Sequence, residues 1–215
     1  MKKKFNITGL CVKGKHYMVD ISDKIKQIIA MVDDGEYFTI NRPRQFGKTT
    51  TLNILREVLS AKYLVIKTSF EGVGDDLFRT ETELCENIFK LWADSVKFTD
   101  KETYQLLLKY NTSKSFRELS EAITEFVLES GRQVVLLIDE VDKSSNSRTF
   151  LQLLGLLRNK YLSASAGDDI TFQSVILAGV HDVRTLKLAI QAESETQFNS
   201  PWNKFICLQV DILIW

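Results

Sequence analysis

The 215-residue sequence contains only two prolines, Pro43 and Pro201, and its ten glycines are not concentrated in any segment. It has no low-complexity stretch and no internal repeat. These absences leave no visible linker, so we expect residues 1–215 to form a single domain. A chain of this length is long enough to bury one sizeable hydrophobic core.

The sequence also lacks an excess of charge of either sign. Its 28 lysines and arginines balance 28 aspartates and glutamates, which gives a formal net charge of zero. Nucleic-acid-binding proteins usually carry a marked basic excess. The composition therefore does not indicate a nucleic-acid partner, although it is compatible with a local basic groove.

Cysteine is scarce, and apolar runs are short. The three cysteines, Cys11, Cys85 and Cys207, form no CxxC pair and no ligand spacing with histidine. This pattern supports neither a zinc site nor a disulfide framework, and we expect reduced thiols that pack as small apolar groups. No stretch reaches the eighteen or so apolar residues of a membrane span, and the basic start MKKKFNITGL lacks the apolar run of a signal peptide. We expect a cytoplasmic protein without membrane contact.

Strands and helices alternate along the chain. The run VVLLID (134–139) is apolar without alternation, as expected for a parallel strand that is covered on both faces. Ser22 is a candidate N-cap for the first helix, and Ser113 or Ser115 for a later one. The order predicts an α/β fold with right-handed crossovers. We expect strands at 37–41, 63–70, 134–139, 174–180 and 205–215, and helices at 22–34, 49–60, 80–95, 115–130 and 147–163.

The loop RPRQFGKTT joins the first expected strand to the helix that follows it, which is the arrangement of a phosphate-binding loop. Gly47 lets the backbone approach the phosphates, Lys48 would pair with the β- and γ-phosphates, and the Thr49 hydroxyl would ligate Mg²⁺. The alternative is a turn glycine followed by an exposed lysine, and the strand–loop–helix order argues against it. The expected nucleotide-binding residues are Arg44, Gln45, Phe46, Gly47, Lys48, Thr49 and Thr50.

This loop departs from the usual pattern GxxxxGK[ST] at its first position. Arg42 stands where the first glycine is expected, and Pro43 has no amide N–H to donate. The backbone amides from about Arg44 onward must therefore hold the phosphates.

Two adjacent carboxylates, Asp139 and Glu140, follow the apolar strand VVLLID. Ligands of open α/β sheets bind at the carboxyl ends of the strands, where the loop at Gly47 also lies. Asp139 would hold Mg²⁺, and Glu140 would orient the attacking water or accept its proton. The alternative is an ordinary acidic loop after a core strand. For Asp142 we expect a solvated or capping role, and the alternative is a third participant in the site.

The segments YMVDIS, YFTINRPRQFGKTTTL, VVLLIDEVD, LAGV and NSPWN resemble the bacterial AAA-ATPase-like family. The resemblance covers about residues 16–203. It implies a three-layer P-loop NTPase of the ASCE, AAA-like group, with a parallel sheet of order 5-1-4-3-2, ATP and Mg²⁺. It also accounts for Arg42, because this family commonly lacks the first glycine. Many members carry a C-terminal nuclease-like domain, for which this sequence has no room.

Further candidates are less specific. His181 or Asp182, after the expected strand 174–180, would sense the γ-phosphate and act in catalysis, and the alternative is a solvated loop residue. Arg148 and Arg184 are arginine-finger candidates, although surface arginines that pair with local carboxylates are the simpler interpretation. By analogy with related folds, residues 17–21 would wall the adenine pocket. The wide apolar face of helix 147–163 suits a core helix, but it would also allow a homo-oligomer or a protein partner.

The chain ends with FICLQVDILIW, which reads as a central strand and is not followed by a helical lid. We expect a truncated or frameshifted product, or a minimal core domain. The function expected is Mg²⁺-dependent ATP binding and hydrolysis coupled to a conformational change. The alternatives are a non-hydrolysing module that is gated by ATP occupancy and, less favoured, a small-molecule kinase.

Overall fold

The apolar runs of the sequence form one parallel sheet in a computed structural model of the protein, which describes residues 15–17, 20–41, 47–144 and 147–180. The described strands lie in the order β1-β4-β3-β2, and every pair is parallel. They are β1 (Phe38–Asn41), β2 (Leu64–Ser69), β3 (Val134–Asp139) and β4 (Ser174–Gly179). The helices are α1 (Ser22–Asp33), α2 (Lys48–Leu59), α3 (Glu81–Val96), α4 (Lys101–Lys109), α5 (Phe116–Ser130) and α6 (Arg148–Ala166), with short 3₁₀ helices η1 (Asp75–Phe78) and η2 (Val141–Ser144).

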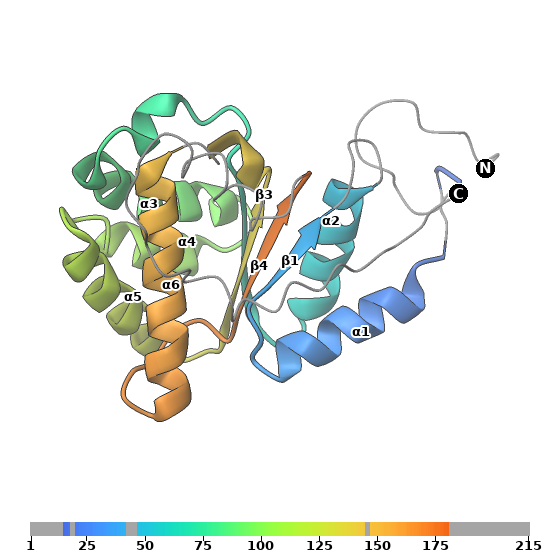
Figure 1. Cartoon of the computed structure of the whole chain (residues 1–215). Helices are drawn as coiled ribbons and strands as arrows, with labels where there is room; N and C mark the ends of the chain where they lie inside the picture. The colour runs from blue at the N-terminus through green and yellow to red at the C-terminus, as the bar shows by residue number, and fades with distance from the viewer. Residues whose placement is uncertain (1–14, 18–19, 42–46, 145–146, 181–215) are drawn as a thin grey trace, which may run out of the picture.

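Helices cover both faces of the sheet and make three layers, as Figure 1 shows. Helices α1 and α2 pack on one face, and α3, α5 and α6 on the other. The side chains of β3 alternate between the two resulting cores, with Leu136 and Ile138 in one and Val135 and Leu137 in the other. Burial of both faces is the reason why the strand sequence shows no polar alternation. The α/β class expected from the sequence is confirmed.

The strand order agrees only in part with the expected 5-1-4-3-2. The four described strands keep their expected neighbours. The fifth strand, expected at 205–215, lies outside the described residues, so the described sheet has four strands and not five.

Side-chain caps fix where several helices begin. Thr80, Asp100, Ser115 and Ser147 each accept a hydrogen bond from a backbone N–H in the first turn of α3, α4, α5 and α6. Such caps satisfy amide groups that have no partner within the helix. Ser115, rather than Ser113, is therefore the cap of α5.

Two expectations about the helices are wrong. Ser22 does not cap α1, because the N-cap is Ile21 and the Ser22 hydroxyl donates instead to Asp20 at 2.5 Å. Helix α4 was not expected, since it is short and only two of its residues, Thr103 and Leu107, are buried. Its one clear sequence signal is the cap at Asp100.

Cys85 lies fully buried in α3, and burial raises the pKa of its thiol to about 12. This agrees with the expectation of a reduced, apolar thiol, while Cys11 and Cys207 lie outside the described residues. None of the helices in the described part of the chain is long and apolar enough to cross a membrane.

Candidate functional site

The site begins where β1 has ended and α2 starts. Gly47 is the N-cap of α2 and has a left-handed backbone with φ of 75°, a conformation that a residue with a Cβ adopts only with strain. Lys48 and Thr49 are the first two residues of the helix. The free N–H groups and the positive end of the helix dipole therefore lie at Gly47–Thr49, where they favour an anion.

Lys48 is buried, and its ammonium group is not hydrogen-bonded by any described residue. Among the described residues it forms an ion pair with Glu140, with Nζ and Oε1 3.6 Å apart. A buried charged group without hydrogen bonds is costly unless a ligand or water completes its shell. An incoming anion would supply that partner.

Thr49 and Asp139 meet although 90 positions separate them in the sequence. The Thr49 Oγ1 hydroxyl donates to Asp139 Oδ2 at 3.0 Å, and the other carboxylate oxygen accepts the Glu140 N–H at 2.9 Å. Asp139 is almost completely buried at the carboxyl end of β3. The hydroxyl and the carboxylate thus lie together, and their sequence neighbours Lys48 and Glu140 approach each other at 3.6 Å.

Glu140 is the only residue other than glycine in the described part of the chain that has a positive φ, at 55°. This conformation costs about 1–3 kcal/mol for most residues and persists where the surroundings enforce it. Here the β3 strand ends at Asp139, and the sharp change of direction at Glu140 brings its carboxylate within reach of Lys48.

Asp142 has the capping role expected from the sequence, at a strand end rather than a helix. Its Oδ1 accepts the N–H of Val180, just beyond β4, at 2.5 Å. The approach is close because Gly179 has no side chain: a Cβ there would overlap Asp142 Oδ1 and lie 3.0 Å from Val141 Cγ2. Asp142 thereby joins the acidic loop after β3 to the end of β4.

Asn41 is a polar candidate that the sequence reasoning missed. It ends β1 immediately before the loop at 42–46, and its Oδ1 is buried without a hydrogen bond from the described residues. Its Nδ2 lies 3.4 Å from Thr39 Oγ1. The signal in the sequence was a polar residue at the last position of the strand, directly before the phosphate-binding loop expected at RPRQFGKTT.

The structure brings together four of the expected site residues, namely Lys48, Thr49, Asp139 and Glu140, next to Gly47. Thr50 is half-buried in the first turn of α2 and forms no hydrogen bond with the acidic pair. Arg148 lies exposed at the start of α6. The remaining expected residues, Arg44, Gln45, Phe46 and His181, lie outside the described residues, as do Arg42, Pro43, Asp182 and Arg184.

The donor set at this place fits Mg²⁺ with a nucleotide. Mg²⁺ in nucleotide sites usually takes one or two protein oxygens and completes its shell with water and phosphate oxygens. Thr49 Oγ1 and the Asp139 carboxylate are such oxygens, 3.0 Å apart. No cluster of three or more histidine, cysteine or carboxylate side chains that could hold a metal on its own occurs among the described residues.

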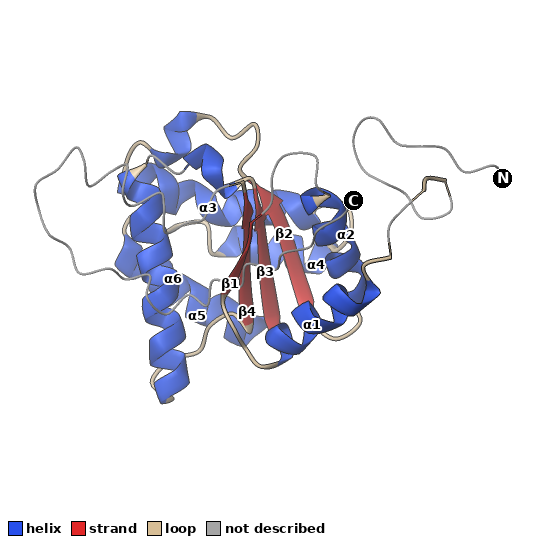
Figure 2. Cartoon of the chain, turned by 45° about the vertical axis from the view of Figure 1, so that its right-hand side comes forward, coloured by secondary structure: helices blue, strands red, loops and turns tan. Residues whose placement is uncertain are grey.

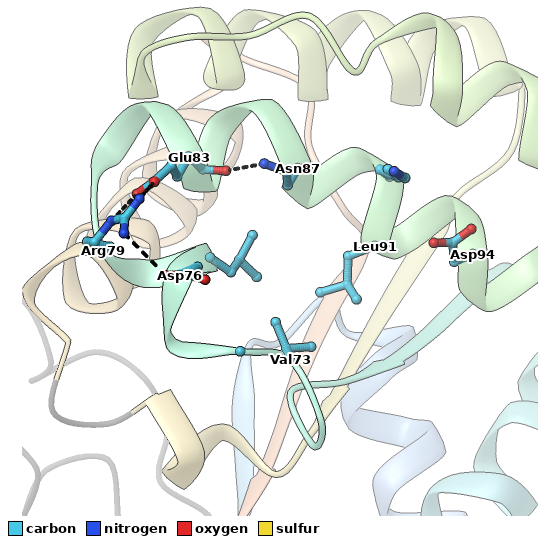
Figure 3. A pocket seen from close by; sticks show the side chains of 10 residues that line it. Val73, Asp76, Arg79, Glu83, Asn87, Leu91 and Asp94 are labelled. Atoms are coloured by element: carbon cyan, nitrogen blue, oxygen red, sulfur yellow. Dashed lines mark hydrogen bonds and ion pairs between the residues drawn. The ribbon is translucent and has the colours of Figure 1, made fainter.

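A separate cavity of about 550 Å³ lies between η1 and α3 and is drawn in Figure 3. Its arginine, Arg79, is already held by Asp76 and Glu83, and Asn87 donates to the Glu83 carbonyl oxygen at 2.8 Å. Because these groups bond to one another, the cavity lacks a free guanidinium that could bind phosphate.

The comparison with solved structures shows the fold. The Walker-type ATPase PABY2304 of Pyrococcus abyssi superposes with a TM-score of 0.53 and 18% sequence identity, over 81% of this chain. The chain spans 48% of the length of that protein. No curated protein sequence matches the chain.

The family comparison covers more than half of the sequence. The model of the AAA-ATPase-like family, described as predicted AAA-ATPase, matches residues 56–189. The match includes Asp139 and Glu140 but starts after the loop at Gly47–Thr49. The chain therefore belongs to the AAA-ATPase-like family.

Proposed function

We propose that the protein binds ATP with Mg²⁺ and hydrolyses it to drive a conformational change. The observation that carries this proposal is the contact between Thr49 Oγ1 and Asp139 Oδ2 at 3.0 Å, together with the approach of the buried Lys48 ammonium to Glu140 at 3.6 Å. A helix N-terminus, a cation and two oxygen ligands meet there, which are the parts that a P-loop site requires. Membership of a family of predicted ATPases supports it.

Each residue has a definite task in this proposal. Lys48 would bind the β- and γ-phosphates, and Thr49 and Asp139 would hold Mg²⁺, which neutralises phosphate charge when it is bound. Glu140 would orient the attacking water and accept its proton. Backbone groups of Arg44, Gln45, Phe46, Gly47 and Thr50 would complete the phosphate cradle, with His181 as the γ-phosphate sensor.

The first test is ATP affinity measured by calorimetry in the presence of Mg²⁺. Lys48→Ala should weaken binding by about 10- to 100-fold, the loss expected for charge-assisted hydrogen bonds. Lys62→Ala is the matched control, because Lys62 is exposed and pairs with Asp33 at 2.9 Å, away from the site. Equal affinity of the wild type and Lys48→Ala would falsify the proposal.

The second test is phosphate release by the purified protein. Glu140→Gln removes the proton acceptor but keeps the shape of the side chain, so ATP binding should persist. Hydrolysis should slow by about 10²- to 10⁴-fold, the usual contribution of a general base. A turnover that does not change in Glu140→Gln would assign the base to another residue.

A second candidate function is a module gated by ATP occupancy without hydrolysis. The contact between Glu140 and Lys48, with Nζ and Oε1 3.6 Å apart, favours it, because a carboxylate engaged by a lysine is not free to orient an attacking water. Measurable ATP binding with no phosphate release by the wild type would support this gate. Phosphate transfer to an added metabolite would instead indicate a kinase.

A further inference from the structure

Strand β2 forms one edge of the described sheet, and Figure 2 shows it as an outermost strand. The N–H groups of Leu64 and Phe70 donate to Gln133 and Asp139 of the β3 side, each at 3.0 Å. In a parallel ladder alternate residues bond to the same neighbour, so Val65 and Lys67 direct their N–H and C=O groups away from β3. No hydrogen bond between described residues outside the ladder engages these groups.

A groove of about 430 Å³ runs along this edge. Val65 and Lys67 form its floor, the C-terminal half of α2 contributes Arg56, and the end of α3 contributes Val96, with Thr99 just beyond it. The unused main-chain groups of β2 therefore face a space with a wall on either side. A strand that entered this space would extend the sheet by one member.

Three cations line the groove, and none forms an ion pair with a described carboxylate. Arg132 donates to the Tyr63 carbonyl oxygen at 2.9 Å, which leaves two cations without a partner among the described residues. Arg56 and Lys67 are half-buried, and neither side chain forms an ion pair or hydrogen bond with a described residue. Burial lowers the pKa of Lys67, the charge of Asp139 opposes that shift, and the neighbouring Arg56 adds to it. The two acids of the groove do not neutralise them: Asp100 caps α4 through Thr103, and Glu57 is exposed.

We propose that the β2 edge is a docking site for an extended acidic peptide segment, which adds as a strand beside Val65 and Lys67. The main-chain groups supply hydrogen bonds to any extended chain, and the two cations select one with carboxylates at alternate positions. A small anion would meet the cations but would leave the amides of Val65 and Lys67 without partners. The charge of Lys67 also discourages unselective edge-to-edge pairing.

The direct test uses amide hydrogen exchange measured by NMR, with an eight-residue peptide of alternating valine and glutamate as the probe. On binding, exchange at the Val65 and Lys67 amides should slow by about tenfold or more, because they become hydrogen-bonded. The Ile66 and Thr68 amides already face β3 and should change little. A peptide with lysine in place of glutamate should not bind.

Variants test separately the role of the groove cations and the role of the main-chain groups of β2. Lys67→Gln should weaken the glutamate peptide about fivefold or more, the effect of losing one partly desolvated ion pair. Lys62→Gln, in the same segment but outside the groove, should leave its affinity unchanged. Val65→Pro removes an outward N–H without removing a bond to β3, and it should abolish peptide binding while the thermal melt shows a folded protein.

Several results would overturn the proposal. These are no binding of the glutamate peptide at millimolar concentration, equal binding of the lysine peptide, and binding that leaves the Val65 and Lys67 amides unprotected. Complete displacement of the peptide by millimolar inorganic phosphate, together with phosphate binding that depends on Lys67 to the same extent, would assign the groove to a small anion instead.

Discussion

At the scale of single residues, Asp142 and Gly179 show how closely the two loops at the site are packed. The Asp142 carboxylate reaches the Val180 N–H only because position 179 has no side chain. A Cβ at 179 would displace Asp142 and Val141 in the segment that follows Asp139 and Glu140.

Gly179→Ala should therefore reduce the free energy of unfolding by about 1–3 kcal/mol, the usual cost of overpacking. Gly155→Ala is the control, because a Cβ at position 155 of α6 meets no atom within 4 Å. That change should stabilise the protein by up to about 1 kcal/mol through helix propensity. Urea unfolding of both variants measures the difference, and equal effects would contradict the packing argument.

Residue-level prediction was possible where the chemistry is local in sequence. Gly47, Lys48 and Thr49 are consecutive, as are Asp139 and Glu140, so their types and order already indicated a phosphate site. The partner of Asp142 could not be read in this way, because Val180 lies 38 positions away and contributes only a backbone amide. Any residue other than proline offers the same amide.

At the scale of elements, Ser147 ties the start of α6 to η1. Its hydroxyl accepts the Phe150 N–H at 3.3 Å and donates to the Phe78 carbonyl oxygen at 2.9 Å. Phe78 and Phe150 also meet edge to face, with ring centroids 5.9 Å apart. The cap thus serves both the helix and its contact with the segment after β2.

Ser147→Ala should cost about 1–2 kcal/mol, since it removes a helix cap together with a hydrogen bond between elements. Ser165→Ala, at the other end of α6, removes only an exposed bond to the Tyr161 carbonyl oxygen and should change stability by less than about 0.5 kcal/mol. Thermal and urea unfolding would distinguish the two. A similar loss of stability in both variants would contradict a particular stabilising role of the Ser147 cap.

Element prediction was reliable for long periodic segments and failed for α4. Helices α3, α5 and α6 bury a continuous apolar face, which the sequence displays at helical spacing. In α4 only Thr103 and Leu107 are buried, and the helix depends on packing against α3 and α5. Because α4 is stabilised by α3 and α5, its own residues do not show a helical pattern strong enough to predict the helix from the sequence alone.

At the scale of the whole molecule, one buried cation joins three separate segments. Lys160 of α6 donates to the Ser120 carbonyl oxygen at 3.0 Å, to Thr124 Oγ1 at 2.7 Å and to Asp169 Oδ2 at 2.6 Å. Burial tends to raise the pKa of Asp169, but the bonds from Lys160 and Thr124 outweigh burial and lower it. The folded protein consequently binds fewer protons here than the unfolded chain.

The free energy of unfolding should accordingly fall as the pH drops below about 4, because protonation of Asp169 then favours the unfolded chain. Asp169→Asn should lower stability by about 2 kcal/mol at pH 7, since Lys160 loses its charged partner. The substitution should also make the decrease in the free energy of unfolding between about pH 5 and 3 less steep. The check is the melting temperature of the wild type and of Asp169→Asn across this pH range. The same pH dependence in both proteins would contradict the role of Asp169.

The sequence by itself determined the α/β class, the positions of the described strands and the residue types of the site. These features depend on local periodicity and on short motifs, which neighbouring residues specify. Only the tertiary structure decided that Thr49 contacts Asp139, that Asp142 caps β4 and that the outer edge of β2 carries two cations without a partner among the described residues. Each of these depends on which strand lies next to which, and that order results from burying two apolar faces of one sheet rather than from any single segment.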